Sequence, residues 1–181
     1  MARRPQGHHI AMSLAHRTII RPARLTDVES IVAFSAAMAL ETEGRHLDQA
    51  RLRQGTLSLL ASTERGFFLV AEQAQGGESR LVGQLMITFE WSDWRNGVFW
   101  WVQSVYVAPS WRRQGIYRAM HESIVAQAKS DQQVCGIRLY VEQDNRRAKT
   151  VYQRVGLAPS SYTVYEHDFV FTRELPPSEK P

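Results

Sequence analysis

Residues Gln103–Met120 read QSVYVAPSWRRQGIYRAM, and they join the end of an apolar strand to the start of a helix. The apolar run finishes at Val107, and Pro109 prevents its continuation. A helix is predicted from about Gly115 to Ser130, because apolar residues recur there at helical spacing. The stretch therefore predicts a strand, a short loop and a helix in direct succession.

The loop in this stretch is suited to bind an anion. The first N–H groups of a helix have no partners within the helix, and they lie at the positive end of its dipole. Gly115 leaves room for a ligand to approach the backbone, and Arg112, Arg113 and Arg118 add positive charge. These features fit a phosphate or pyrophosphate, with a solvated arginine surface as the alternative. The sequence contains neither GxxxxGK[ST] nor GxGxxG, which excludes a P-loop and a dinucleotide fingerprint.

Strand and helix patterns alternate along the rest of the chain. Thr26 and Glu29 have the spacing of a capping box, and Asn96-Gly97 between two strand patterns is typical of a hairpin. This order predicts a mixed α/β (α+β) fold with a central, largely antiparallel twisted sheet flanked by helices. The expected strands are 18–23, 67–72, 81–91, 98–107, 137–141 and 162–171, and the expected helices are 26–44, 48–61, 115–130 and 145–154.

Length and charge limit the function classes. A chain of 181 residues with 44% hydrophobic and 22% charged side chains is ordinary for one globular domain. We expect a disordered N-terminal extension over 1–17, a single domain over 18–173 and a flexible tail over 174–181. Three of the 22 bases and none of the 18 acids lie in residues 1–17, so the remainder carries a net charge of only +1. A nucleic-acid partner is therefore not predicted.

Other compositional features exclude further classes. No apolar run approaches the roughly 20 residues of a membrane span, so no membrane partner is predicted. Cys135 is the only cysteine and cannot form an internal disulfide, which indicates a reducing, cytoplasmic setting. His8 and His9 are adjacent but have no further ligands at metal-binding spacing, so no metal is predicted.

Two motifs resemble those of the GNAT superfamily of N-acetyltransferases. The first is V-x-P in Val107–Pro109 followed by RRQGIY at 112–117, similar to the family's (Arg/Gln)-x-x-Gly-x-(Gly/Ala). The second is Asn145-x-x-Ala148-x-x-x-Tyr152, followed by Gly156-Leu157. The resemblance covers roughly 18–170 and implies a GNAT-like acyl-CoA N-acyltransferase fold. Tyr117 departs from the pattern, because the family usually has Gly or Ala there.

The resemblance implies acetyl-CoA as the co-substrate. Its pantetheine arm would pair with the strand at Val105, Tyr106 and Val107, where the family splays this strand from the next one, often at a bulge. Asn145 would contact the pantetheine region, with a helix N-cap as its alternative role. The diphosphate would lie on the loop residues Arg112, Arg113, Gln114, Gly115, Ile116, Tyr117 and Arg118.

The implied reaction is direct transfer to an amine in a ternary complex. The Val105 N–H would stabilise the oxyanion. Tyr152 would protonate the departing thiolate, since a phenol stays protonated at neutral pH, and a core aromatic is its alternative role. The strand over 99–107 carries no acid, so the base stays open: Gln103 could hold a water, and Glu90 is a candidate. The other candidates are Glu41, Glu43, Asp93 and Glu142.

The hairpin is rich in aromatic residues, which are Phe89, Trp91, Trp94, Phe99, Trp100 and Trp101. They form core or dimer packing, or a wall that accepts a cationic or flat amine, and Glu41 and Glu43 would favour a positive acceptor. The function implied is an acetyl-CoA-dependent N-acetyltransferase acting on a small-molecule or peptide amine. A catalytically silent acyl-CoA-binding module on the same fold is the alternative, and a homodimer stays open.

Overall fold

The computed structural model describes residues 18–75 and 78–170. They divide into two compact units, one up to Asp144 and one from Asn145 onward. The predicted N-terminal extension, the C-terminal tail and the His8-His9 pair lie outside the described residues. The single domain over 18–173 stays a prediction.

The first unit is built on a five-stranded sheet in the order β1-β2-β3-β4-β5. The pairs β1–β2, β2–β3 and β3–β4 are antiparallel, and β5 runs parallel to β4. The predicted mixed, largely antiparallel sheet is therefore confirmed. The strands are β1 (Thr18–Pro22), β2 (Gly66–Gln75), β3 (Glu78–Ser92), β4 (Gly97–Val107) and β5 (Val134–Leu139).

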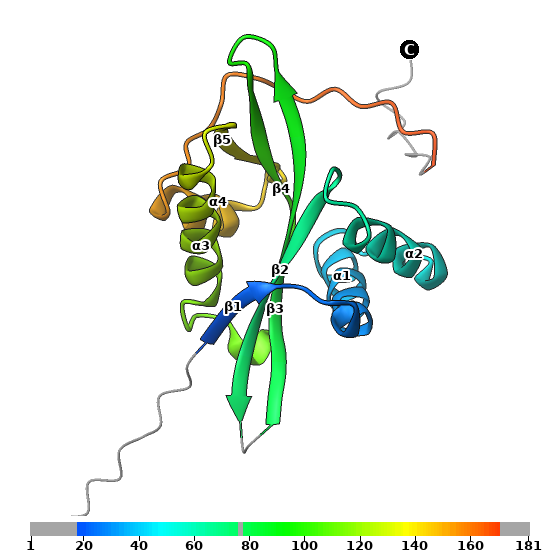
Figure 1. Ribbon diagram of the computed structural model, residues 1–181. Coiled ribbons are helices and arrows are strands. Elements are labelled where there is room, and N and C mark those ends of the chain that lie inside the picture. The colour runs from blue at the N-terminus through cyan, green and yellow to red at the C-terminus, as the bar shows by residue number, and fades with distance from the viewer. Residues whose placement is uncertain (1–17, 76–77, 171–181) are drawn as a thin grey trace, which may run out of the picture. The chain divides into compact units, whose positions relative to one another are not determined.

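Three α-helices cover this sheet: α1 (Val28–Glu43) and α2 (Gln49–Leu60) lie on one face, and α3 (Ile116–Ser130) lies on the other (Figure 1). Helix α1 ends at Gly44, whose left-handed φ of 62° suits glycine. Helix α2 begins after Asp48, whose carboxylate accepts a hydrogen bond from the Arg51 N–H at 3.0 Å. Both helix boundaries agree with the prediction.

The start of α1 differs from the prediction. The capping box of Thr26 and Glu29 is wrong, because a short 3₁₀ turn precedes the helix and Asp27 occupies the N-cap position. The Asp27 carboxylate accepts a hydrogen bond from the Arg24 N–H at 2.7 Å and pairs with Arg21 of β1 at 2.8 Å. The Arg24 N–H and the Arg21 guanidinium therefore both hold the Asp27 carboxylate at the start of this helix.

The larger core lies between the sheet and α3. Met120 and Ile124 of α3 are fully buried against Leu85 and Ile87 of β3. Burying each such side chain stabilises the fold by about 1.5–3 kcal/mol. A smaller core on the opposite face consists of Ile31, Leu59, Phe68 and Val70. Both faces of the sheet are thus covered, which leaves strand edges and helix ends for ligands.

The second unit contains one helix, α4 (Arg146–Arg154), among its described residues. Residues 162–170 form no strand there, so the predicted last strand is wrong over this range, and Phe171 lies outside the described residues. Tyr162, Val164 and Phe169 have the residue types of a strand but are exposed. A strand also requires a neighbour to pair with, and local sequence does not supply one.

Candidate functional site

Strands β4 and β5 separate partway along their length. Their pairing runs from Val98 opposite Val134 to Val102 opposite Leu139. Among the described residues, no strand pairs with the remaining part of β4, Gln103–Val107, on this side. Every second residue in this part of β4 therefore points its backbone N–H and C=O groups toward the β5 side, where no described strand pairs with them. We call this point of divergence the β4–β5 fork.

A β-bulge lies at the fork. The pairing of β4 with β3 steps from Val102 opposite Ile87 to Ser104 opposite Met86, so Gln103 is an extra residue in β4. Its side-chain amide donates a hydrogen bond to the Thr88 hydroxyl at 2.8 Å. A bulge bends its strand and increases the local twist, which accounts for the departure of β4 from β5. The splayed strands and the bulge implied by the resemblance are both present.

The loop after β4 leads directly into the N-terminus of α3. Arg113 and Gly115 adopt left-handed conformations, with φ of 65° and 82°. The first hydrogen bond within the helix runs from the Ala119 N–H to the Gly115 carbonyl at 2.9 Å. The N–H groups of Ile116 and Arg118 have no acceptor among the described residues. A Cβ atom on Gly115 would meet nothing within 4 Å, so the turn is open and fits an anionic group.

Arg112 connects this loop to α1. Its Nη1 and Nη2 donate to the two carboxylate oxygens of Glu41 at 2.5 and 2.6 Å, and its Nε donates to the Val107 carbonyl at 2.8 Å. The hydrogen bond from Glu41 raises the pKa of Arg112 against the lowering effect of burial. Sequence analysis missed this pair, because 71 residues separate its members and no local pattern indicates it.

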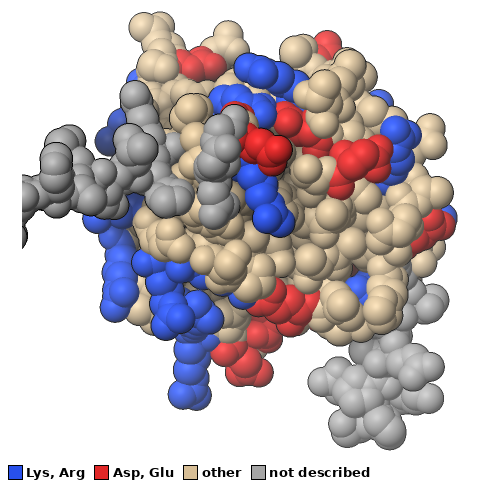
Figure 2. Space-filling model, turned by 90° about the horizontal axis from the view of Figure 1, so that it is seen from below, with Lys and Arg blue, Asp and Glu red and all other residues tan. Residues whose placement is uncertain are grey.

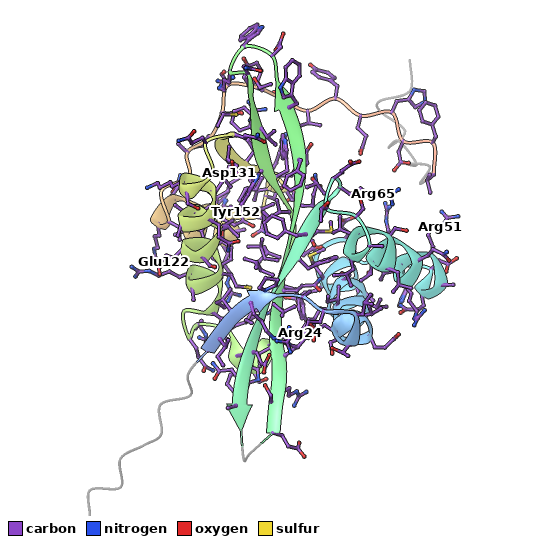
Figure 3. All side chains as sticks on the ribbon, in the orientation of Figure 1. Arg24, Arg51, Arg65, Glu122, Asp131 and Tyr152 are labelled. Carbon is purple, nitrogen blue, oxygen red and sulfur yellow. The ribbon has the colours of Figure 1, made fainter. Side chains whose placement is uncertain are left out.

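The other two loop arginines are arranged differently. The Arg118 Nε donates to Glu122 at 2.7 Å, which raises the pKa of Arg118, and Glu122 projects from α3 on the side away from the sheet (Figure 3). Arg113 is exposed and forms no ion pair within the described part of the chain. Arg113 is therefore the loop arginine whose charge is not already balanced by a carboxylate.

A cluster of charged and aromatic side chains lies beside the fork. The Glu90 carboxylate accepts a hydrogen bond from the Trp101 indole N–H and pairs with Arg138 of β5 at 2.9 Å. The Arg138 guanidinium lies 3.6 Å from the centre of the Phe99 ring. Glu90 is one of the candidate bases named from the sequence, and Trp101 and Arg138 engage both its carboxylate oxygens in this structure.

The comparison with known families gives one match. Residues 31–157, more than half of the chain, match the acetyltransferase (GNAT) family. The chain belongs to the GNAT family. A comparison with curated proteins gave no match.

Solved structures agree with this assignment to the GNAT family. A possible acetyltransferase from Clostridium difficile 630 is 38% identical with a TM-score of 0.77, over 85% of this chain and 99% of that chain. Aminoglycoside N-acetyltransferase AAC(6')-Iy in complex with CoA is 12% identical with a TM-score of 0.67, over 85% and 96%. Ribosomal-protein-alanine N-acetyltransferase from Brucella melitensis biovar Abortus 2308 is 16% identical with a TM-score of 0.62, over 84% and 100%. The last two likenesses show the fold alone.

The second unit of this GNAT protein carries two of the predicted site residues. The Asn145 side chain accepts a hydrogen bond from the Ala148 N–H at 2.9 Å, so its role as the N-cap of α4 is confirmed. Tyr152 lies on the same helix and is partly buried. Burial raises the pKa of Tyr152 above the ordinary value of a phenol, which keeps its hydroxyl protonated at neutral pH.

The hairpin aromatics divide between core and surface. Trp100 is buried, and its ring centre lies 5.1 Å from that of Phe67 and 6.2 Å from that of Phe89. Trp91 and Trp94 are 64% and 83% exposed, so core packing does not account for them. Core packing therefore accounts for Trp100, whereas a role for Trp91 and Trp94 in a dimer or an acceptor wall stays a prediction.

The remaining surface observations concern charge, metals and membranes. Acidic and basic side chains are interspersed on the face drawn in Figure 2. Within 18–75 and 78–170, no three His, Cys, Asp or Glu side chains are grouped closely enough to hold a metal ion. None of the helices described in these ranges has both the length and the apolar character needed to cross a bilayer.

Proposed function

We propose that this GNAT protein transfers the acetyl group of acetyl-CoA to a primary amine of a small molecule or peptide. One observation carries the proposal: the open strand edge at Gln103–Val107 is followed, after the loop over 108–115, by an open helix N-terminus. An amide-bearing arm can pair with such an edge, and a diphosphate fits such a terminus. The similarity to the Clostridium difficile protein and to a CoA-bound acetyltransferase structure supports this assignment.

The chain's own residues would bind acetyl-CoA in two sections. The backbone of Val105, Tyr106 and Val107 would pair with the pantetheine arm, with Asn145 as a further contact. The diphosphate would lie on the N–H groups of the α3 terminus, where the exposed Arg113 adds charge. Arg112, held by Glu41, would fix the loop. The loop residues in this proposal are Arg112, Arg113, Gln114, Gly115, Ile116, Tyr117 and Arg118.

The proposed chemistry is a direct attack in a ternary complex. The amine nitrogen forms a bond to the acetyl carbon, the carbon–sulfur bond breaks, and CoA leaves as a thiolate. The Val105 N–H stabilises the oxyanion, and the Tyr152 hydroxyl donates its proton to the thiolate. The raised pKa of Tyr152 suits this role, because the group must be protonated when the thiolate forms. Positioning the two substrates together supplies much of the acceleration.

The attacking ammonium must first lose a proton. Glu90 already accepts hydrogen bonds from Trp101 and Arg138, so its carboxylate is occupied by structural partners. The Gln103 amide nitrogen is held by Thr88, and no group described in the structure donates to its carbonyl oxygen. We therefore propose that Gln103 positions a water that carries the proton to solvent.

Thiol release distinguishes an enzyme from the silent acyl-CoA-binding alternative. The full chain is mixed with acetyl-CoA and a panel of primary amines, and free CoA is titrated with a thiol reagent, with amine-free samples as controls. The proposal predicts release that depends on the amine. Binding of acetyl-CoA without release for any amine would support the silent module instead.

We also propose a cytoplasmic location. Cys135 is a free thiol and the only cysteine of the chain. A reducing compartment keeps such a thiol reduced. Cell fractionation with detection of the chain tests this, and recovery of the chain outside the cytoplasmic fraction would contradict it.

A further inference from the structure

Two stacked aromatic rings lie at the closed end of the β4–β5 fork. The rings of Trp101 and Tyr140 are stacked, with centres 4.3 Å apart and planes inclined by 26°. Trp101 is opposite Arg138, next to the last paired residues of β4 and β5, and Tyr140 directly follows Leu139. We call Trp101 and Tyr140 the ring platform. Tyr140 is 51% exposed, so the platform is accessible within the first unit.

The ring platform lies on the sheet face that also carries α1 and α2. Trp100 and Leu139 pack into the core beneath α3. Successive side chains in a strand point to opposite faces, so Trp101, next to Trp100, faces the other way, and Tyr140 stacks on the Trp101 ring. The platform is therefore on the opposite side of the sheet from the helix whose N-terminus would hold the diphosphate.

The platform is held in place by charged neighbours. The Trp101 indole donates to Glu90, which is paired with Arg138, and Arg138 lies over the Phe99 ring. A ring fixed in this way loses little rotamer freedom when a ligand stacks on it. Glu90 is thus a positioning residue for Trp101.

Chain direction places the platform beside the proposed acetyl group. The loop that would hold the diphosphate follows Val107, the last residue of β4. An arm that starts at this loop and pairs along β4 proceeds from Val107 toward Gln103. Its thioester end therefore arrives near the closed end of the fork, where the ring platform lies.

The carboxylates that could attract a cationic acceptor are already paired with arginines, which does not favour a polycation. Glu41 and Glu43, which would favour a positive acceptor, pair with Arg112 at 2.5 Å and Arg45 at 3.8 Å. Glu90 is balanced by Arg138, and the Arg95 guanidinium lies 5.0 Å from the centre of the Phe99 ring. The side chains around the platform therefore offer apolar ring surface without excess negative charge.

We propose that the acceptor is an amine that carries an aromatic ring, which stacks on the exposed ring of Tyr140, itself supported by Trp101. This inference rests on the proposed acetyl transfer and specifies its substrate class. Stacked aromatic pairs contribute more than the burial of their area alone. An aromatic amine should consequently be preferred over a saturated amine of the same size and charge.

The test compares 2-phenylethylamine with 2-cyclohexylethylamine, and spermidine serves as a polycationic amine. We expect kcat/KM to be about 3- to 10-fold higher for the aromatic amine than for its saturated counterpart, with spermidine the poorest. Tyr140→Leu and Trp101→Leu should bring the ratio of the first two amines to within about twofold. Trp94→Leu is the matched control, because Trp94 is an exposed aromatic in the hairpin turn, and it should leave the ratio unchanged.

Acetyl-CoA binding is measured by calorimetry for every variant. This measurement distinguishes a failure of the proposed acetyl transfer from a failure of the aromatic-acceptor inference. If Trp101→Leu loses thermal stability, Tyr140→Leu still tests the platform, because the Tyr140 ring is half exposed and its removal should perturb folding less. Three results would overturn the inference alone: equal use of the two amines, transfer to neither of them while another amine of the panel is acetylated, or a preference that survives both platform substitutions. If acetyl-CoA binds but no amine is acetylated, the proposed function fails instead. If acetyl-CoA does not bind, the proposed function itself fails.

Discussion

Both carboxylate oxygens of Glu41, at the end of α1, accept hydrogen bonds from the Arg112 guanidinium, with N···O distances of 2.5 and 2.6 Å. The same arginine donates to the Val107 carbonyl at 2.8 Å. These contacts join α1, the end of β4 and the loop before α3. We therefore expect Arg112 to stabilise the loop, and the exposed Arg113 to contact an anionic ligand.

The two neighbouring arginines should therefore respond differently to truncation. Arg112→Ala should lower the free energy of unfolding by about 1–2 kcal/mol, because it removes partly screened charged hydrogen bonds. Arg113→Ala should change stability by less than about 0.5 kcal/mol and weaken acetyl-CoA binding about 3- to 10-fold. Urea denaturation and calorimetry measure the two effects. A stable Arg112→Ala variant with wild-type binding would contradict the assignment.

Gly115 offers a test of the open turn. Gly115→Ala places a side chain at a φ of 82°, which should cost roughly 1–2 kcal/mol of stability, and it should weaken acetyl-CoA binding at least about 10-fold by filling the turn. Gly44→Ala is the matched control, since its φ is 62° and a Cβ there also meets nothing within 4 Å. The control should lose similar stability and keep its affinity. Equal affinity losses in both variants would count against a ligand at Gly115.

Local sequence predicted the fold where a few adjacent residues decide the structure. Gly44, Asp48 and Asn145 mark helix ends because a left-handed glycine or an N-cap acts within one helical turn. The family resemblance, carried by the strand–loop–glycine–helix order around Gly115, likewise led to the fork and the open helix terminus.

Features that depend on distant residues could not be read from the pattern. The partner of Arg112 is Glu41, which lies 71 residues away. Tyr140 was not recognised as a ring-platform residue, because only the pairing of β4 with β5 brings it to Trp101. The predicted strand at 162–171 failed over 162–170, since its residue types alone do not supply a neighbouring strand.

Tyr152 is expected to act on the leaving group. Tyr152→Phe should lower kcat at least about 10-fold with little change in acetyl-CoA affinity, because a general acid acts mainly in the transition state. Burial raises the pKa of Tyr152, so any loss of wild-type activity caused by its ionisation should appear only above pH 10. Tyr165→Phe, at a residue that is 94% exposed, is the control. Unchanged turnover in Tyr152→Phe would remove the residue from the mechanism.

His121 should make stability depend on pH. Its imidazole is buried on α3, and burial lowers the pKa of His121 although the nearby Glu122 acts in the opposite direction. The unfolded chain then binds the proton more readily, so the free energy of unfolding should fall as the pH drops below about 6.5, by at most about 1.4 kcal/mol per pH unit. Urea titrations at pH 7.5, 6.5 and 5.5 measure this slope. His121→Gln should flatten it, whereas His46→Gln, at an exposed residue, should not; the same slope in both variants would refute the assignment.

Titration of the intact chain with acetyl-CoA in a calorimeter asks whether the β4–β5 fork and the α3 terminus bind this co-substrate. The β4–β5 fork and the α3 terminus predict saturable binding of one acetyl-CoA per chain, with a Kd on the order of 1–100 μM and a rise in melting temperature. Absence of both heat and thermal stabilisation at millimolar acetyl-CoA would contradict the claim that these elements form an acetyl-CoA site.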